Sequence, residues 1–413
     1  MVRLGGLFGH PETHFKTIHI AGSKGKGSTA AFIASIMESA GFKTGLYTSP
    51  HVTSYKERIT LAGKELDESL YISLINLIYE KIGGLKTGDL AGDEGPTTFE
   101  LLTILAFLTF REVGCEWAVI ETGIGGRLDA TNVIMPEASV LTPVEKEHTD
   151  ILGVTLDSIA LEKAGIIKKS TPVFCGYQYP LVENIFKKTA AARSAPFYLL
   201  KEHIKSLNST LSLEGTAIEI SWHDGSSSKG LLLLNGDFQA ENAALATLTT
   251  RYILSNCALS SAASRTGINA IIEKGLDKTT LPGRMELILK QPPIILDGAH
   301  TPVSIGRLVK AFTSLFFIDS ILIFGSVIGK DNESMADILA PVFHQIIIST
   351  PGTFKKSNVQ AVYAAFLRRN PHTILEASPQ KALEYAMELS DNIKPILVCG
   401  SFYMVAEIRK LLV

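Results

Sequence analysis

A chain of 413 residues is long enough for two or three domains, each with its own hydrophobic core. The formal net charge of −2 and the hydrophobic fraction of 46% are typical of a globular protein, and no basic tract favours nucleic acid as a partner. We expect neither a signal peptide at the polar N-terminus nor a membrane span, and the four scattered cysteines favour reduced core residues. We therefore expect a cytoplasmic monomer.

Residues 18–51 predict a strand, a glycine-rich loop, a helix and a second strand. The apolar run 18–20 suits a buried parallel strand, Ser28 and Thr29 are expected to cap the helix, and a strand begins again at residue 43. Backbone N–H groups of such a loop, together with the helix dipole, bind phosphate. We predict that this loop binds ATP and that Lys26 reaches the β- and γ-phosphates. The predicted loop residues are Gly22, Ser23, Lys24, Gly25, Lys26, Gly27 and Ser28.

The loop differs from the ordinary P-loop, GxxxxGK[ST], in which a hydroxyl residue follows the lysine directly and binds Mg²⁺. Here Gly27 intervenes, so the metal needs a ligand from elsewhere. Ser28 is one candidate, and Ser49, at the end of the next strand, is another. The alternative is a tight turn with two exposed lysines, which leaves the flanking strand and helix unexplained.

The loop sequence GSKGKGS, followed by YTSPH and ERI, resembles the folylpolyglutamate synthase and dihydrofolate synthase family. These are ATP-dependent amide-forming enzymes of the Mur ligase superfamily. The family usually has Thr-Asn where this chain has Ser23-Lys24, which places an extra positive charge beside the phosphates. The resemblance implies that the loop after YTSPH binds a pterin-bearing substrate through Tyr55 and Arg58. An ordinary surface charge is the alternative for Arg58.

Two helices follow, separated by a glycine-rich polar loop. Thr97 or Thr98 is expected to cap the second helix, with Glu100 completing a capping box. Capping alone accounts for these residues, but the family has a Thr-x-Phe-Glu motif near its substrate. The resemblance therefore implies a substrate role for Phe99. The predicted ranges are 67–82 for the first helix, 83–95 for the loop and 101–113 for the second helix.

Residues 117–121 predict a strand that ends in Glu121. A carboxylate at the end of a strand beside a phosphate loop is a natural Mg²⁺ ligand, and a buried glutamate without a partner is costly. The run ETGIGGRLDATN closely matches the family. Its LDATN ending resembles members that also make dihydrofolate, which implies that Asp129 and Ala130 contact dihydropteroate.

A strand at 138–141 and a helix at 157–167 carry two further candidates. His148 follows the strand, and residue chemistry alone would not choose histidine for Mg²⁺. The resemblance makes His148 a ligand of a second metal ion, so one or two Mg²⁺ ions are expected. Lys163 lies in the EKAGI motif, where the family lysine can be carbamylated into a carboxylate-like metal ligand. The alternative is a solvated helix lysine.

The stretch 178–230 mixes short helical and strand patterns, including 216–222, and is expected to form peripheral elements. An alanine-rich helix then opens at residue 236. Gln239 and Asn242 lie one turn apart on it and share a face. Carboxamides suit hydrogen bonds to adenine and ribose, so we predict that both residues bind ATP.

A second domain is expected from residue 283. Pro282 and Gly283 are predicted to break the preceding helix, and Arg284 is available to a phosphate. LPGR-x-E, DGAH and the late GS-x-Y match the family, which implies that Asp297 and His300 face the nucleotide and the incoming amino acid. An ordinary polar turn is the alternative there. The predicted elements are strands at 293–296, 321–324, 345–349 and 396–399, helices at 303–312, 334–343, 357–369 and 379–389, and a final helix.

The expected fold is α/β and Mur ligase-like. A P-loop ATPase domain with a mainly parallel sheet spans 1–282, and a smaller Rossmann-like domain spans 283–413. The expected activity is ATP-dependent addition of L-glutamate to a folate-type carboxylate, either tetrahydrofolate or dihydropteroate, through an acyl phosphate. The expected catalytic residues are Lys26, Glu121, His148 and Lys163. Three alternatives stay open: a ligase of cell-wall precursors, a P-loop ATPase switch or kinase, and a binding protein without chemistry.

Overall fold

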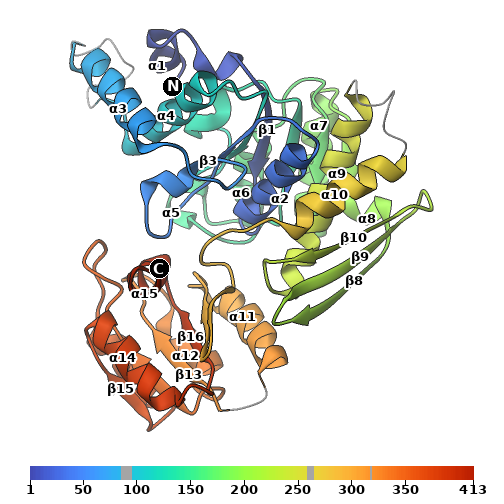
Figure 1. Ribbon diagram of the computed structural model, residues 1–413. Helices are drawn as coiled ribbons and strands as arrows, with labels where there is room; N and C mark the ends of the chain where they lie inside the picture. Colours follow the sequence, from blue (N-terminus) through green and yellow to red (C-terminus); the bar gives the residue numbers. More distant parts are fainter. Residues whose placement is uncertain (85–94, 258–264, 317–318) are drawn as a thin grey trace.

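The computed structural model describes residues 1–84, 95–257, 265–316 and 319–413, which form two α/β domains (Figure 1). The loop predicted at 83–95 lies almost wholly outside these described residues. Within them, no helix combines the length and the apolar content that crossing a membrane requires.

A seven-stranded sheet forms the centre of the N-terminal domain, in the order β3-β2-β4-β1-β5-β6-β7. Every neighbouring pair is parallel except β2 with β3. Its central strands are almost wholly buried, as their continuous apolar runs predict for a sheet covered on both faces. The strands are β1 Lys16–Ala21, β2 Thr44–Tyr47, β3 Ile59–Leu61, β4 Trp117–Glu121, β5 Ala138–Leu141, β6 Val173–Cys175 and β7 Phe197–Leu199.

Helices cover both faces of this sheet. Val119 of β4 contacts the layer that contains α2, α9 and α10, whereas its neighbours Ala118 and Ile120 contact the layer of α3 and α4. Helices α6 and α7 cover β5 and β6. The helices are α1 Val2–Leu7, α2 Lys26–Ser39, α3 Glu68–Gly83, α4 Thr98–Glu112, α5 Thr149–Leu152, α6 Leu156–Ala164, α7 Pro180–Ala192, α8 Leu200–His203, α9 Asp237–Asn256 and α10 Arg265–Asp277.

The peripheral stretch forms a three-stranded antiparallel sheet, β10-β9-β8, which contacts α9 and α10 at the side of the domain (Figure 1). The strand predicted at 216–222 is present as β9, Gly215–Trp222. It pairs with β8, Ile204–Ser212, and β10, Ser227–Leu232.

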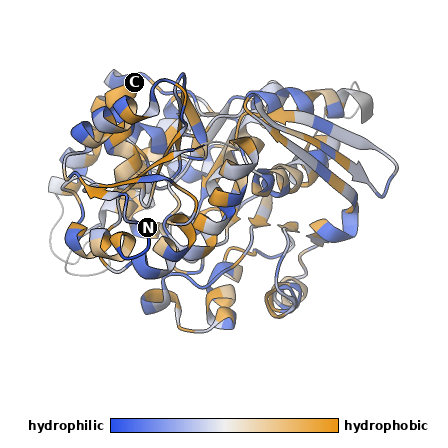
Figure 2. Cartoon of the chain, turned by 90° about the horizontal axis from the view of Figure 1, so that it is seen from below, coloured by the Kyte–Doolittle hydropathy of each residue, from blue (hydrophilic) through white to orange (hydrophobic). Residues whose placement is uncertain are grey.

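A six-stranded sheet in the order β11-β12-β16-β13-β14-β15 forms the C-terminal domain, and only β11 is antiparallel to its neighbour. Helices α11, α12 and α13 cover one face, and α14 and α15 cover the other. The strands of both parallel sheets are largely hydrophobic (Figure 2). The elements are β11 Glu286–Lys290, β12 Pro293–Leu296, α11 Pro302–Leu315, β13 Ile321–Phe324, α12 Asn332–Leu339, β14 Gln345–Ile348, α13 Val359–Leu367, β15 Thr373–Leu375, α14 Pro379–Ser390, β16 Ile396–Cys399 and α15 Phe402–Leu412.

Two sequence expectations about these elements are wrong. Ser28 and Thr29 do not cap α2: the helix already begins at Lys26, its N-cap is Gly25, and both hydroxyl residues are buried inside it. The helix before Pro282 ends at Asp277, so the Pro-Gly pair lies in a linker rather than at the helix end. The short strands β11 and β15 were not predicted. The expectation of reduced core cysteines agrees with buried free thiols at Cys115, Cys175 and Cys399, whereas Cys257 is a free thiol that is partly exposed.

Candidate active site

A cavity of about 1070 Å³ lies between the two domains. It is lined by the loops that follow β1, β2, β4 and β5, and on the other side by the turn after β12 and the start of α15. Carboxyl ends of parallel strands are where α/β proteins bind their ligands. The fold therefore gathers residues that are up to several hundred positions apart into one site.

The phosphate loop between β1 and α2 depends on its glycines. A Cβ atom at Gly22, where φ is 151°, would lie 1.9 Å from the Thr142 hydroxyl oxygen. A Cβ atom at Gly25, where φ is 83°, would lie 2.2 Å from Asn242 Oδ1. Gly25 also serves as the N-cap of α2 without any side-chain cap. The first N–H groups of α2 are thus available to an anion.

The polar residues of the loop are anchored to the segment that follows β5. The Ser23 hydroxyl donates to the carbonyl oxygen of Glu145 at 3.0 Å, and the Lys24 backbone N–H donates to that of Pro143 at 3.2 Å. Burial lowers the pKa of the Lys24 ammonium, whereas the nearby carboxylates of Glu147 and Glu145 act to raise it. Both side chains line the cavity, with Gly27 and Ser28.

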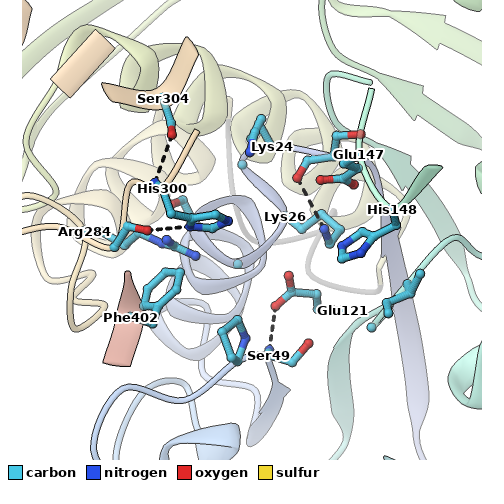
Figure 3. A pocket seen from close by; sticks show the side chains of 18 of the residues that line it. Lys24, Lys26, Ser49, Glu121, Glu147, His148, Arg284, His300, Ser304 and Phe402 are labelled. Atoms are coloured by element: carbon cyan, nitrogen blue, oxygen red, sulfur yellow. Dashed lines mark hydrogen bonds between the residues drawn. The ribbon is translucent and has the colours of Figure 1, made fainter. Parts of the chain in front are cut away.

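Lys26, Glu121 and His148 surround one part of the cavity (Figure 3). Lys26 Nζ lies 3.5 Å from the carbonyl oxygen of Ser23. Glu121, at the end of β4, is 3% exposed and accepts a hydrogen bond from the backbone N–H of Ser49 at 2.9 Å. Burial raises the pKa of its carboxyl group, and Lys26 opposes that rise. Ser49 therefore contacts Glu121 through its backbone, and its hydroxyl is not used in that bond.

Lys163 is not the solvated helix lysine of the alternative interpretation, because it is 1% exposed. Its Nζ donates to the carbonyl oxygen of Gly22 at 2.7 Å and to Glu147 Oε1 at 3.0 Å. Burial, with Lys26 nearby, lowers the pKa of Lys163 to about 8. Burial alone would raise the pKa of Glu147, but Lys26 and Lys163 outweigh it and hold that pKa below its usual value.

His148 has a left-handed backbone, with φ of 48°, and is the N-cap residue of α5. Its ring lines the cavity beside Glu147. Burial lowers the pKa of His148, Glu147 acts in the opposite direction, and Lys26 adds to the lowering. The ring is consequently neutral near pH 7 and keeps a nitrogen lone pair that can bind a cation.

Gln239 and Asn242 share one face of α9, as their spacing predicts. Asn242 Nδ2 donates to Gln239 Oε1 at 3.0 Å. Gln239 Nε2 is buried, and among the described residues it has no hydrogen-bond acceptor. Both residues line the cavity with the phosphate loop. An unpaired buried amide donor in this position is unusual in a folded protein.

The C-terminal domain contributes Arg284, Asp297 and His300. The Arg284 guanidinium lies over the Phe402 ring, 4.4 Å from its centroid. Asp297 accepts backbone N–H groups from Met285 at 2.8 Å and from Ala299 at 2.7 Å, so part of its role is to shape this turn. The cavity wall buries the His300 ring, and burial lowers its pKa to about 4.

The structure places four of the five predicted substrate residues at the cavity. Arg58, Phe99, Asp129 and Ala130 line the cavity, whereas Tyr55 does not. Tyr55 is 50% exposed and packs on the His51 ring at 4.3 Å, with Arg58 5.7 Å from the Tyr55 ring centroid. Arg58 is partly buried.

Asp129 holds the loop after β4 in place. One carboxylate oxygen accepts the backbone N–H groups of Gly123 at 2.9 Å and Ile124 at 3.0 Å, and the other accepts that of Thr131 at 2.9 Å. Burial raises the pKa of Asp129, and these bonds oppose the rise. Its carboxylate thus organises the loop as well as lining the cavity.

Several other cavity residues were not predicted from the sequence. Phe402 and Tyr403 lie in the GS-x-Y motif, which is a sequence signal that could have identified them. Glu147 stands beside His148 without a distinctive pattern. Four further cavity residues carry no sequence signal, since only the fold brings them there: Glu145, Phe238, Arg307 and Lys355.

Comparison with known proteins gives consistent matches over nearly the full chain. Residues 20–250 match the Mur ligase middle domain, and residues 283–402 match the Mur ligase glutamate ligase domain. The chain is 30% identical to a dihydrofolate synthase/folylpolyglutamate synthase of Bacillus subtilis, covering 99% of this chain and 93% of the relative. It is 33% identical to a folylpolyglutamate synthase of Lacticaseibacillus casei, covering 98% and 91%.

Solved structures of folylpolyglutamate synthases also resemble this chain over its full length. The structure of Mycobacterium tuberculosis folylpolyglutamate synthase complexed with ADP and AMPPCP superposes with a TM-score of 0.90 at 28% identity, covering 100% of this chain and 94% of that one. A separate structure, described as a folylpolyglutamate synthase complex with AMPPCP and folate, gives a TM-score of 0.81 at 30% identity, covering 100% of this chain and 94% of that one. With its paired Mur ligase domains and these full-length relatives, the chain belongs to the folylpolyglutamate synthase and dihydrofolate synthase family of Mur ligases.

Proposed function

We propose that this enzyme joins L-glutamate to a folate-type carboxylate in an ATP-dependent reaction. The observation that carries the proposal is the interdomain cavity, where Lys26 and Glu121 of one domain lie in the same space as Asp297 and His300 of the other. Relatives of this chain bind ATP analogues and folate. We also propose that residues 1–282 and 283–413 are the two functional units, acting in a cytoplasmic monomer.

The reaction has two steps in this proposal. A substrate carboxylate oxygen attacks the γ-phosphorus of ATP, the bond to the bridging oxygen of ADP breaks, and an acyl phosphate forms. The glutamate amine then attacks the acyl carbon, phosphate leaves, and the amine proton passes to solvent as the amide forms. Lys26 and the N–H groups of α2 stabilise charge on the transferring phosphoryl group, and no protein nucleophile is needed.

Both domains contribute residues to the nucleotide site, and the C-terminal domain also holds the incoming glutamate. Gln239 and Asn242 suit the base and ribose of ATP, because a buried amide donor there lacks an acceptor among the described residues. Arg284, Asp297 and His300 suit the nucleotide phosphates and the incoming glutamate. Closing the two domains around the substrates keeps water from the acyl phosphate.

Mg²⁺ fits the residues on the N-terminal side of the cavity. Within the described residues no group of three or more histidine, cysteine, aspartate or glutamate side chains could hold a metal ion alone. Mg²⁺ needs no such group, because it keeps waters and shares substrate phosphates with one or two carboxylates. Glu121 is a buried carboxylate suited to that role, with Ser28 and Ser49 as hydroxyl candidates. When bound, the metal would offset negative charge on the phosphates.

A second ion would be held by His148 and by Lys163 if that lysine is carbamylated. The unmodified ammonium repels a cation, so the modification is a requirement of this part of the proposal. The low pKa of Lys163, about 8, supports it, because only the neutral amine reacts with CO₂.

The acceptor carboxylate belongs to dihydropteroate, to tetrahydrofolate, or to both. Asp129 and Ala130 of the LDATN run line the cavity, which supports dihydropteroate. The test is ATP turnover with Mg²⁺ and glutamate, comparing the two acceptors and recording product masses. A mass gain of one glutamate on either acceptor supports the proposal, and the pattern of gains identifies the acceptor. ATP turnover without glutamate would favour a switch or kinase, and no gain on either acceptor would favour cell-wall precursors.

A further inference from the structure

Two cations from different domains line the cavity, and one of them, Lys355, is exposed to solvent and so lies where the cavity opens. Arg58 comes from the loop before β3, and Lys355 comes from the segment between β14 and α13. Among the described residues, neither side chain forms an ion pair. Arg58 donates instead to the His51 ring at 2.9 Å.

Aromatic rings surround these cations. Phe354 is 73% exposed and stacks on Tyr403, with ring centroids 5.6 Å apart. Lys355 Nζ lies 6.0 Å from the Phe354 ring centroid, and Tyr403 lines the cavity with Lys355. Burial raises the pKa of Tyr403, and the Arg58 guanidinium, which lines the same cavity, opposes that rise.

Carboxylates near this rim are already used within the protein. Glu57 accepts the backbone N–H groups of Val52 at 2.6 Å and Thr53 at 2.9 Å. Glu407 pairs with Lys410 at 3.3 Å. The positive charge of Arg58 and Lys355 is therefore available to an anionic ligand that reaches into the cavity.

The proposed reaction defines where such an anion would be. The γ-carboxylate that is activated must lie beside Lys26, deep in the cavity. In a γ-linked glutamyl tail, every earlier glutamate keeps a free α-carboxylate, and these lie progressively farther from the reacting end. A tail that enters through the mouth thus places α-carboxylates along the rim.

We propose that Arg58 and Lys355, flanked by Phe354 and Tyr403, form a subsite for the α-carboxylates of a γ-glutamyl tail. This inference rests on the proposed function and adds how the enzyme distinguishes acceptors by tail length. Arg58 is the cation of the subsite from the N-terminal domain, and Lys355 is the cation from the C-terminal domain. A longer tail therefore bridges the two domains.

The test uses Lys355→Gln with Lys356→Gln as its matched control, because Lys356 is the neighbouring exposed lysine and does not line the cavity. KM is measured for tetrahydrofolate acceptors that carry one glutamate and three glutamates, at low and high salt. Exposed ion pairs have modest strength, so we expect Lys355→Gln to raise KM for the triglutamate about threefold and Lys355→Glu about tenfold. The kcat values should stay within about twofold, since no reacting atom is touched.

The control variant should leave both KM values unchanged, and the wild-type KM for the triglutamate should rise more steeply with salt than that for the monoglutamate. Equal KM values in the Lys355→Gln and Lys356→Gln variants, or an equal rise for both acceptors, would overturn the subsite and leave the ligase function intact. Glutamate addition to dihydropteroate alone would also overturn it. A wild-type enzyme that adds glutamate to no acceptor would instead contradict the proposed function.

Discussion

Lys163 donates a 2.7 Å hydrogen bond to the carbonyl oxygen of Gly22, which lies 141 positions earlier in the chain. The bond ties α6 to the first residue of the phosphate loop, and Glu147 accepts the second hydrogen bond of the same ammonium group. A buried lysine in this position affects both the shape of the loop and the charge beside the phosphates.

The first prediction concerns the chemical state of Lys163. Its pKa of about 8 lies below the ordinary lysine value, so the neutral amine becomes common as the pH rises through 8 and rare as it falls below. We expect bicarbonate to increase turnover at pH 8 more than at pH 6.5. Carbon-13 NMR with labelled bicarbonate should show a carbamate signal that Lys163→Gln removes. A signal that persists in that variant would place the carbamate elsewhere.

The second prediction concerns Gly25. Gly25→Ala should weaken ATP binding, because the new Cβ atom would lie 2.2 Å from Asn242 Oδ1. Gly9→Ala is the matched control: Gly9 also has positive φ, at 71°, but nothing lies within 4 Å of its Cβ position. Both variants carry the backbone strain of roughly 1–2 kcal/mol, so calorimetric ATP affinity isolates the clash. Equal ATP affinities in the two variants would show that the phosphate loop or Asn242 shifts to accommodate the new Cβ atom at little cost.

The third prediction concerns Lys26. Lys26→Ala should lower kcat by about 10²–10³-fold or more, because a positioned charge that stabilises the transition state is lost. KM for the folate-type acceptor should change little. Lys24→Ala serves as the comparison, since Lys24 belongs to the same loop and lines the same cavity. If kcat fell more in Lys24→Ala than in Lys26→Ala, the roles assigned to the two lysines would be reversed.

The fourth prediction concerns the metal. Glu121→Gln keeps the shape of the side chain and removes its charge, so the Mg²⁺ concentration for half-maximal turnover should rise about tenfold or more. Glu112→Gln, on the exposed end of α4, should not change it. Because burial raises the pKa of Glu121, acidification should protonate this carboxylate and raise the Mg²⁺ concentration for half-maximal turnover in the wild type. The glutamine side chain does not titrate, so the variant should show a smaller change. An unchanged Mg²⁺ requirement in Glu121→Gln would remove this residue from the metal site.

The sequence predicted most of the fold because the parallel strands are continuous apolar runs and the glycines mark the turns. It failed at α2, where hydroxyl side chains suggested a cap. Ordinary capping rules place Ser or Thr at the N-cap, but in this loop the N-cap is Gly25, with positive φ. The strands β11 and β15 were missed because one is only partly buried and the other has three residues.

The site was predictable where chemistry and motif coincide in one segment, as for Lys26 and Glu121. It was not predictable where the fold joins distant segments. Arg307 of α11 lies 3.5 Å from Glu145, across the domain boundary, and neither residue has a distinctive neighbour in the sequence. Lys355 reaches the cavity from the C-terminal domain in the same way. The position of such residues can be recognised only when the arrangement of the two domains is known.

The central claim is that the acceptor carboxylate is phosphorylated by ATP before the amide forms. The most direct measurement supplies an acceptor whose reacting carboxylate carries oxygen-18, with ATP, Mg²⁺ and glutamate, and analyses the inorganic phosphate by mass. An acyl phosphate intermediate predicts that one labelled oxygen appears in the phosphate for every amide formed. Amide formation with unlabelled phosphate would contradict the account, because the carboxylate oxygen would then never have been joined to phosphorus.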